Sequence, residues 1–172
     1  MGYSIKEFSE AIQGHDLLKP THYTVDIVSP VFTKNDIYAE SVTIPGRSIS
    51  TQERRTFGPQ REMPYERLFA GDLDITFMFS RAVGDSGKQI RTDIEEWMDA
   101  VITEKNIINR EWDDYTGTIK ISVDYPDNGP AWTCEVMDVY PKTVSPVQLG
   151  YGMANDYLKQ AVSFAFREYK IV

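Results

Sequence analysis

The side chains that could perform acid–base or nucleophilic chemistry are few, and none has the neighbours that catalysis needs. His15 lies in a connector and His22 at the start of a predicted strand, where surface and turn histidines are common. Cys134 follows Trp132 within an apolar strand pattern, which is typical of a buried, inert thiol. A catalytic site brings a nucleophile, a base and an orienting group together. The sequence therefore predicts a protein that is not an enzyme.

Two acidic groupings have the residue types of a calcium site or of the paired carboxylates of glycoside hydrolysis: Asp113 with Asp114, and Asp124 with Asp127. The EF-hand spacing is absent, and turn chemistry explains the run Asp127-Asn128-Gly129 without an ion. The chain has one cysteine and no HExxH pair, so zinc is not predicted. We expect no metal and no cofactor.

The composition is that of one folded domain spanning residues 1–172. The chain is 41% hydrophobic and 26% charged, with a formal net charge of −8 and a sequence pI near 4.8. An acidic chain is unsuited to gripping nucleic acid or anionic lipid over its whole surface. A single cysteine excludes an intrachain disulfide, and we expect the chain to fold in a reducing cytoplasm. No apolar run is long enough for a transmembrane helix, so we expect no membrane anchor.

The hydrophobic pattern predicts a mainly β (α+β) fold. A helical period predicts one long helix over residues 87–103, and a shorter amphipathic helix precedes Gly14. A Pro-Asp-Asn-Gly-Pro run at 126–130 predicts a tight turn between two antiparallel strands. We expect an antiparallel β-sandwich or small barrel with one flanking α-helix. Period-two alternation predicts the strands at residues 22–28, 38–44, 72–79, 119–123, 132–140 and 158–169.

Residues 47–67 do not fit the pattern of a self-contained domain. The segment holds five arginines and three glutamates, a net charge of +2 that leaves −10 for the rest of the chain. It has few apolar residues to hold it on a core and a Gly-Pro turn near its centre, which favours a long projecting hairpin or arm that meets another chain. A mobile surface loop is the alternative. The candidate interface residues are Arg47, Glu53, Arg54, Arg55, Phe57, Arg61, Glu62 and Arg67.

The order and spacing of several segments resemble tail tube proteins of contractile-tailed bacteriophages. The segments are residues 14–20 with the strand 23–27, Ser41-Val42-Thr43-Ile44-Pro45-Gly46 before the arm, residues 71–77, and the helix that contains Glu96-Trp97. The likeness spans nearly the whole chain. At the level of fold the chain is also similar to the type VI secretion tube protein and to baseplate tube-initiator proteins.

The resemblance implies an assembly. Six copies would form a ring, and stacked rings would form a hollow tail tube through which phage DNA passes without specific binding. The implied partners are other copies of the chain, the sheath protein, the tape-measure protein and the baseplate tube initiator. The implied location is the virion, after assembly in the host cytoplasm. An acidic lumen would avoid holding DNA phosphates, and Asp72, Asp74 and Asp124 are candidates to line it.

Two other functions stay open at this stage. A baseplate tube initiator would share the fold but would be present as one ring, whereas a tube has many. A small soluble binding module would use the arginine-rich arm to capture an acidic or phosphorylated ligand.

Overall fold

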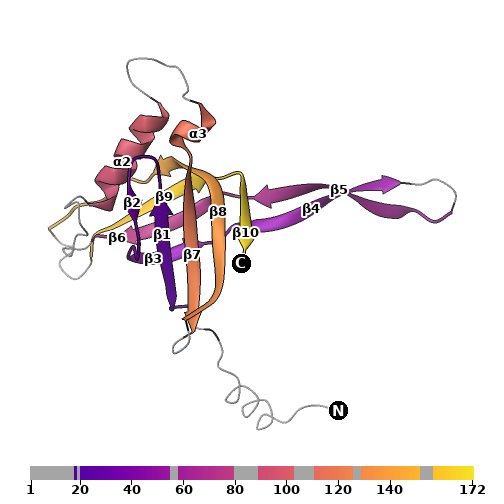
Figure 1. Ribbon diagram of the computed structural model, residues 1–172, viewed down its shortest axis with the longest axis horizontal. Coiled ribbons are helices and arrows are strands. Elements are labelled where there is room, and N and C mark those ends of the chain that lie inside the picture. Colours follow the sequence, from indigo (N-terminus) through magenta and orange to yellow (C-terminus); the bar gives the residue numbers. More distant parts are fainter. Residues whose placement is uncertain are drawn as a thin grey trace, which may run out of the picture.

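Ten strands and two helices make up the part of the chain that the computed structural model describes, which is residues 18, 20–54, 58–79, 89–102, 111–125, 129–151 and 157–172 (Figure 1). The two helices are α2 (Ile90–Val101) and α3 (Trp112–Tyr115). The strands are β1 (Tyr23–Val28), β2 (Thr33–Lys34), β3 (Ala39–Thr43), β4 (Gly46–Arg54), β5 (Arg61–Ala70), β6 (Leu73–Met78), β7 (Gly117–Tyr125), β8 (Gly129–Val144), β9 (Lys159–Ala165) and β10 (Glu168–Ile171).

The body of the protein is a strongly curved antiparallel sheet in the order β2-β1-β7-β8-β9-β6-β3, with β10 paired to β8. Strand β8 joins its two halves. The first part of β8 pairs with β7 up to Val139, and the last part pairs with β9 from Tyr140 onward. Asp138, just before this change of partner, has a φ of 54°, a conformation that aspartate tolerates better than most residues. The strand therefore crosses from one layer of the sandwich to the other at this point.

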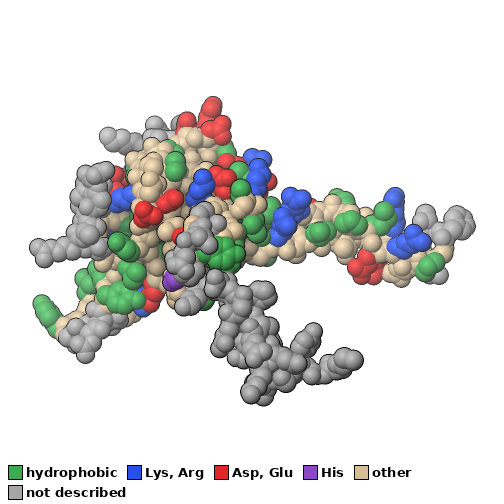
Figure 2. Space-filling view, turned by 60° about the horizontal axis from the view of Figure 1, so that its bottom comes forward, with side chains coloured by type: hydrophobic (Ala, Val, Ile, Leu, Met, Phe, Trp, Pro, Cys, Tyr) green, Lys and Arg blue, Asp and Glu red, His purple; other side chains and the backbone are tan. Residues whose placement is uncertain are grey.

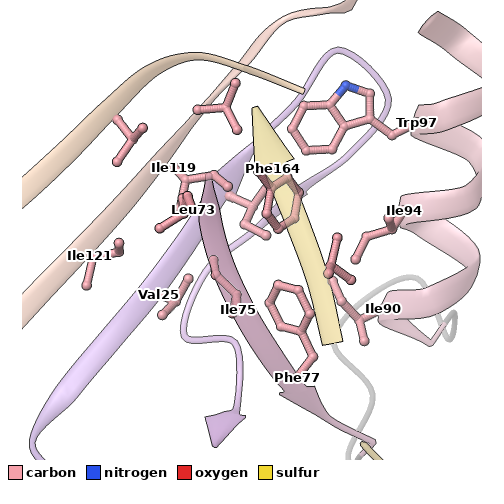
Figure 3. Close-up of a cluster of buried hydrophobic side chains, with 14 of the residues drawn as sticks. Val25, Leu73, Ile75, Phe77, Ile90, Ile94, Trp97, Ile119, Ile121 and Phe164 are labelled. Atoms are coloured by element: carbon pink, nitrogen blue, oxygen red, sulfur yellow. The ribbon is translucent and has the colours of Figure 1, made fainter. Parts of the chain in front are cut away.

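The core lies between the two layers and under α2 (Figure 3). Trp97 of α2 packs against Phe164 of β9, with ring centroids 6.0 Å apart, and Phe164 meets Phe77 of β6 edge to face at 6.3 Å. The inward residues of the remaining strands complete one buried cluster. Its members are Val25, Ile27, Leu73, Ile75, Phe77, Ile90, Ile94, Trp97, Ile119, Ile121, Cys134, Val136, Val139, Val162 and Phe164.

Two polar contacts fix α2 on this core. The indole Nε1 of Trp97 donates a hydrogen bond of 2.7 Å to the backbone carbonyl of Tyr115. The buried Asp93 carboxylate forms an ion pair with Lys34 of β2. Buried polar groups are costly without such partners, so these contacts specify where the helix sits.

The predicted fold class is confirmed: the protein is mainly antiparallel β, with a flanking helix and a projecting hairpin. One strand prediction was wrong. The segment 158–169 is not a single strand, because β9 pairs with β6 and the end of β8, whereas β10 pairs with an earlier part of β8. The chain must turn between them, at Phe166 and Arg167. The predicted opening helix lies outside the described residues.

Candidate assembly surface

Strands β4 and β5 form a two-stranded sheet of their own that projects far from the body (Figure 1). Every residue of these two strands is exposed except Ser50 and Phe69, which are half-buried. An isolated two-stranded hairpin is at best marginally stable in water, because neither face is covered. Both faces of this hairpin are therefore left uncovered by the rest of the described chain.

Aromatic contacts hold the hairpin to the body at its base. The ring of Phe69 lies 5.3 Å from that of Tyr169 and 6.0 Å from that of Phe166. These partners come from β10 and from the turn that precedes it. Gly71, with a φ of 84°, provides the left-handed conformation at the turn from β5 into β6. The hairpin is thus anchored at one end and free along the rest of its length.

The register divides the hairpin into two faces, because directly opposed residues in an antiparallel pair lie on the same side and successive residues alternate. We name them by the charged pairs near the tip, Arg54 opposite Arg61 and Glu53 opposite Glu62. The arginine face consists of Ser48, Ser50, Gln52, Arg54, Arg61, Met63, Glu66 and Leu68. The glutamate face consists of Arg47, Ile49, Thr51, Glu53, Glu62, Pro64, Arg67 and Phe69.

Like charges that oppose each other directly destabilise a sheet unless another group compensates them. Within the described part of the chain, the four hairpin arginines (Arg47, Arg54, Arg61 and Arg67) make no ion pair and no side-chain hydrogen bond. Glu53 accepts a hydrogen bond from the Gln60 amide. Near the tip in Figure 2, acidic side chains lie on the lower side of the hairpin and basic ones above them. No other side chain in the described part of the chain therefore compensates the charges of these four arginines.

Exposed apolar side chains accompany these charges. The exposed fractions are 75% for Tyr65, 63% for Ile49, 47% for Met63 and 45% for Leu68. Large apolar groups gathered on one projecting element are typical of an interaction site. Sequence reasoning singled out the charged residues and missed these four as surface-forming groups. The signal was weak because a hairpin that is exposed on both faces shows no alternation between apolar and polar residues.

Of the predicted interface residues, the structure places Arg47, Glu53 and Arg54 on β4, and Arg61, Glu62 and Arg67 on β5. Arg55 and Phe57 lie outside the described residues. The six described residues belong to one surface element, as the sequence suggested, but they are distributed over both of its faces. Their role as an interface stays a prediction.

The three acidic residues predicted to line a lumen do not lie together. Asp72 and Asp74 are neighbours at the start of β6, whereas Asp124 is on β7, and β8 and β9 lie between these two strands. Asp72 forms an ion pair with Lys142 at 2.7 Å, and this contact raises the pKa of the Lys142 ammonium. Asp74 points away from the core and accepts a hydrogen bond from the Ser163 hydroxyl.

The described residues hold no grouping suited to catalysis or metal binding. No three His, Cys, Asp or Glu side chains among them are placed to hold a metal ion. Cys134 is buried, and burial raises the pKa of its thiol, so the reactive thiolate is disfavoured. No helix in this part of the chain is long and apolar enough to cross a membrane.

The fold is shared with chains of contractile injection systems. A chain of the extracellular contractile injection system PVC, from its sheath–tube complex in the extended state, aligns with a TM-score of 0.64 at 13% identity over 99% of both chains. A chain from the tube-terminating cap of the anti-feeding prophage aligns with a TM-score of 0.64 at 14% identity, covering 94% of this chain and 98% of the other. A chain from the baseplate of that prophage aligns at 0.63 and 10% identity, covering 91% and 97%. No curated protein sequence is significantly similar to this one.

These likenesses define the class of fold. The sequence then places the chain within it: residues 18–172 match the family model described as phage tail tube protein, and the chain belongs to that family. The resemblance drawn from the sequence is confirmed. The chain is therefore a structural component of a tail, and the prediction that it is not an enzyme is confirmed by its family.

Proposed function

We propose that this protein is the repeating subunit of the inner tail tube, assembling as stacked hexameric rings through which phage DNA passes. The observation that carries the proposal is the projecting hairpin, which exposes both faces and holds four arginines that no described side chain pairs. A monomer gains nothing from such an element, whereas a subunit buries it against its neighbours. Strand β3 also ends the sheet of the described residues, which leaves one edge for a neighbouring copy.

The hairpin provides the contacts between subunits in this proposal. Arg47, Glu53, Arg54, Arg55, Phe57, Arg61, Glu62 and Arg67 would lie at these interfaces. The remaining partners are the sheath protein, the tape-measure protein and the baseplate tube initiator, and assembly takes place in the host cytoplasm before the tube becomes part of the virion.

The outer face of β3, β6 and β9 is suited to the lumen wall. Its side chains are small, neutral or acidic over most of its area, and include Ser41, Thr43, Asp74, Thr76, Ala161 and Ser163. Two lysines belong to this face, and both form ion pairs: Lys142 at its border with Asp72, and Lys159 of β9 with Glu40. Each unpaired cation along a lumen would add salt-dependent affinity for phosphates and slow the passage of DNA. We therefore propose that Asp72 and Asp74 face the channel, whereas Asp124 lies on a different part of the sheet.

Electron microscopy of the purified protein tests the assembly. We expect rings or tubes from the full chain, and a folded protein without tubes when residues 50–66 are replaced by Asn-Gly, which joins the directly opposed Ile49 and Arg67 by a two-residue turn. A circular dichroism spectrum that keeps the β signal is the folding control. Normal tube growth from the shortened variant would contradict the role of the hairpin.

The size of the assembly distinguishes a tail tube from the two alternative functions, a baseplate tube initiator and a small binding module. A single ring that does not stack would indicate a tube initiator. A monomer that persists at high concentration would indicate a binding module and would contradict the tube.

The lumen assignment has its own test. Tubes of Asp74→Lys should bind a short DNA duplex at low salt more tightly than wild-type tubes do. Asp114→Lys on α3 makes the same change of charge outside the proposed lumen wall and is the matched control. Equal binding by the two variants would contradict the assignment.

A further inference from the structure

A cavity of about 470 Å³ opens between the two layers of the sandwich, beside β3, the strand at which the described sheet ends. The described residues begin at Leu18, and Leu18 itself lines this cavity. We propose that the segment before it, residues 5–17 of the same chain, docks in the cavity through an apolar helix face. This contact lies within one chain and is independent of the contacts between copies.

The cavity exists because one layer of the sandwich extends beyond the other. Tyr23, Val123 and Trp132 stand in register on β1, β7 and β8 and form one row on the inner face of their layer. All three line the cavity and are only half-buried. The adjacent row is fully buried in the core and consists of Val25, Ile121 and Cys134. The second layer therefore ends one row too early to cover the first.

The walls of the cavity are suited to an apolar occupant. Val42 and Ile44 form the side opposite the uncovered row, and both are half-buried. The hydroxyl of Tyr23 donates a hydrogen bond of 2.7 Å to a backbone carbonyl of β3, so its polar atom already has a partner. Glu40 also lines the cavity, and its carboxylate is held in an ion pair with Lys159. Apolar groups that enter this space would remove apolar wall surface from water.

The sequence before Leu18 supplies such groups. Ile5, Phe8 and Ile12 recur at helical spacing and share one face of the helix predicted before Gly14. An isolated helix of this length is marginal in water, so its apolar face needs a surface to pack on. The opposite face is polar and consists of Lys6, Glu7 and Glu10. The segment thus has one face for the cavity and one for the solvent.

The length of the segment allows it to reach the cavity. From Ile5 to Ile12 a helix would extend about 12 Å. Residues 15–17 can span about 10 Å, enough to return the helix to the wall that Leu18 forms. A short tether of this kind gives an effective concentration of about millimolar. The segment of the same chain is therefore favoured over that of a second copy.

Disulfide formation tests the docking. In a Cys134→Ala background, Ile12→Cys places a thiol on the apolar helix face and Val42→Cys places one on the cavity wall. We expect mild oxidation to give a monomeric chain without free thiols on a non-reducing gel. Glu10→Cys with Val42→Cys is the matched control, because its thiol is tethered equally closely but lies on the polar face. It should crosslink much more slowly.

A second pair of variants tests the apolar face. Added to the Ile12→Cys and Val42→Cys chain, Phe8→Asp should lower the docking constant at least about tenfold, the factor that corresponds to exposing one aromatic ring. Gln13→Asp makes the same change of charge off the apolar face and should leave the crosslink unchanged. Circular dichroism confirms that each variant is folded.

Trp132 provides a readout that needs no added cysteine. In a Trp112→Phe background the other indole, Trp97, is fully buried, so acrylamide reports on Trp132. Phe8→Asp should increase the quenching and Gln13→Asp should not. Equal crosslinking of the two cysteine positions, or equal quenching of the two aspartate variants, would overturn the docking. Disulfides that join two chains would assign the cavity to a neighbouring copy and would overturn it as well.

Discussion

The indole Nε1 of Trp97 lies 2.7 Å from the backbone carbonyl oxygen of Tyr115 and donates a hydrogen bond to it. This contact joins α2 to the segment that leads into β7. The same side chain is fully buried and packs edge to face against Phe32 and at a tilt against Phe164. Trp97 therefore connects the helix to both layers of the sandwich.

We expect Trp97→Phe to lower the free energy of unfolding by about 1–3 kcal/mol, because the Tyr115 carbonyl loses its donor. Trp97→Ala should cost about 3–5 kcal/mol, since it adds a cavity to that loss. Urea denaturation followed by circular dichroism measures both. Trp112→Phe is the matched control: Trp112 is 43% exposed, and the change should cost no more than about 0.5 kcal/mol. Equal effects at the two positions would contradict the role of the hydrogen bond.

Gly117→Ala should destabilise the protein by about 1–3 kcal/mol through overpacking. A Cβ at this position would lie 2.5 Å from the carbonyl oxygen of Val28 and 3.0 Å from the Trp97 ring. The backbone of β1 cannot yield as a flexible side chain would. Gly46→Ala is the control, because a Cβ there meets no atom within 4 Å, and its effect on thermal unfolding should be close to zero. A Gly117→Ala protein as stable as the wild type would show that β1 can move away.

The ion pair between Lys34 and the buried Asp93 carboxylate should show strong coupling in a double-mutant cycle. Lys34→Met leaves a buried carboxylate without this cation and should cost about 3 kcal/mol. Asp93→Leu should cost less, since Lys34 is partly exposed and its ammonium can reach water. The double variant should recover much of the loss, because no charge is then buried. Additive effects in urea denaturation would contradict the coupling.

Cys134 should make stability depend on pH in the alkaline range. Burial raises the pKa of its thiol, so the unfolded chain loses the proton first as pH rises above about 8.5. The folded state then binds more protons than the unfolded state, and the free energy of unfolding falls as pH increases. Cys134→Ala should show a shallower decline between pH 8 and 10. The same burial predicts that a thiol reagent reacts with Cys134 in urea but hardly at all in the folded protein, and fast reaction in buffer would contradict it.

The strands of the body were largely predictable from the sequence. Apolar and polar residues alternate in segments such as Leu73–Met78, because one face of the strand is buried and the other is exposed. That pattern is a local property of the chain. The helix Ile90–Val101 was also predictable from a local pattern. Its apolar residues recur at helical spacing, so that Ile94 and Trp97 lie on one face and enter the same buried cluster. The arginine-rich arm was recognisable as a projecting element because its composition could not support a core.

The tertiary structure alone decided how these elements pair. The break between β9 and β10, and the passage of β8 between layers near Asp138, depend on which distant strands each part of the chain meets. The same is true of the hairpin. Its sequence shows arginines and glutamates side by side, but only the register and the bulge at Ser50 and Thr51 place Arg54 opposite Arg61 and Glu53 opposite Glu62. Composition determined that this chain would carry a charged arm, and pairing decided which charges share a face, because a shift of one residue reverses the side on which every later side chain lies.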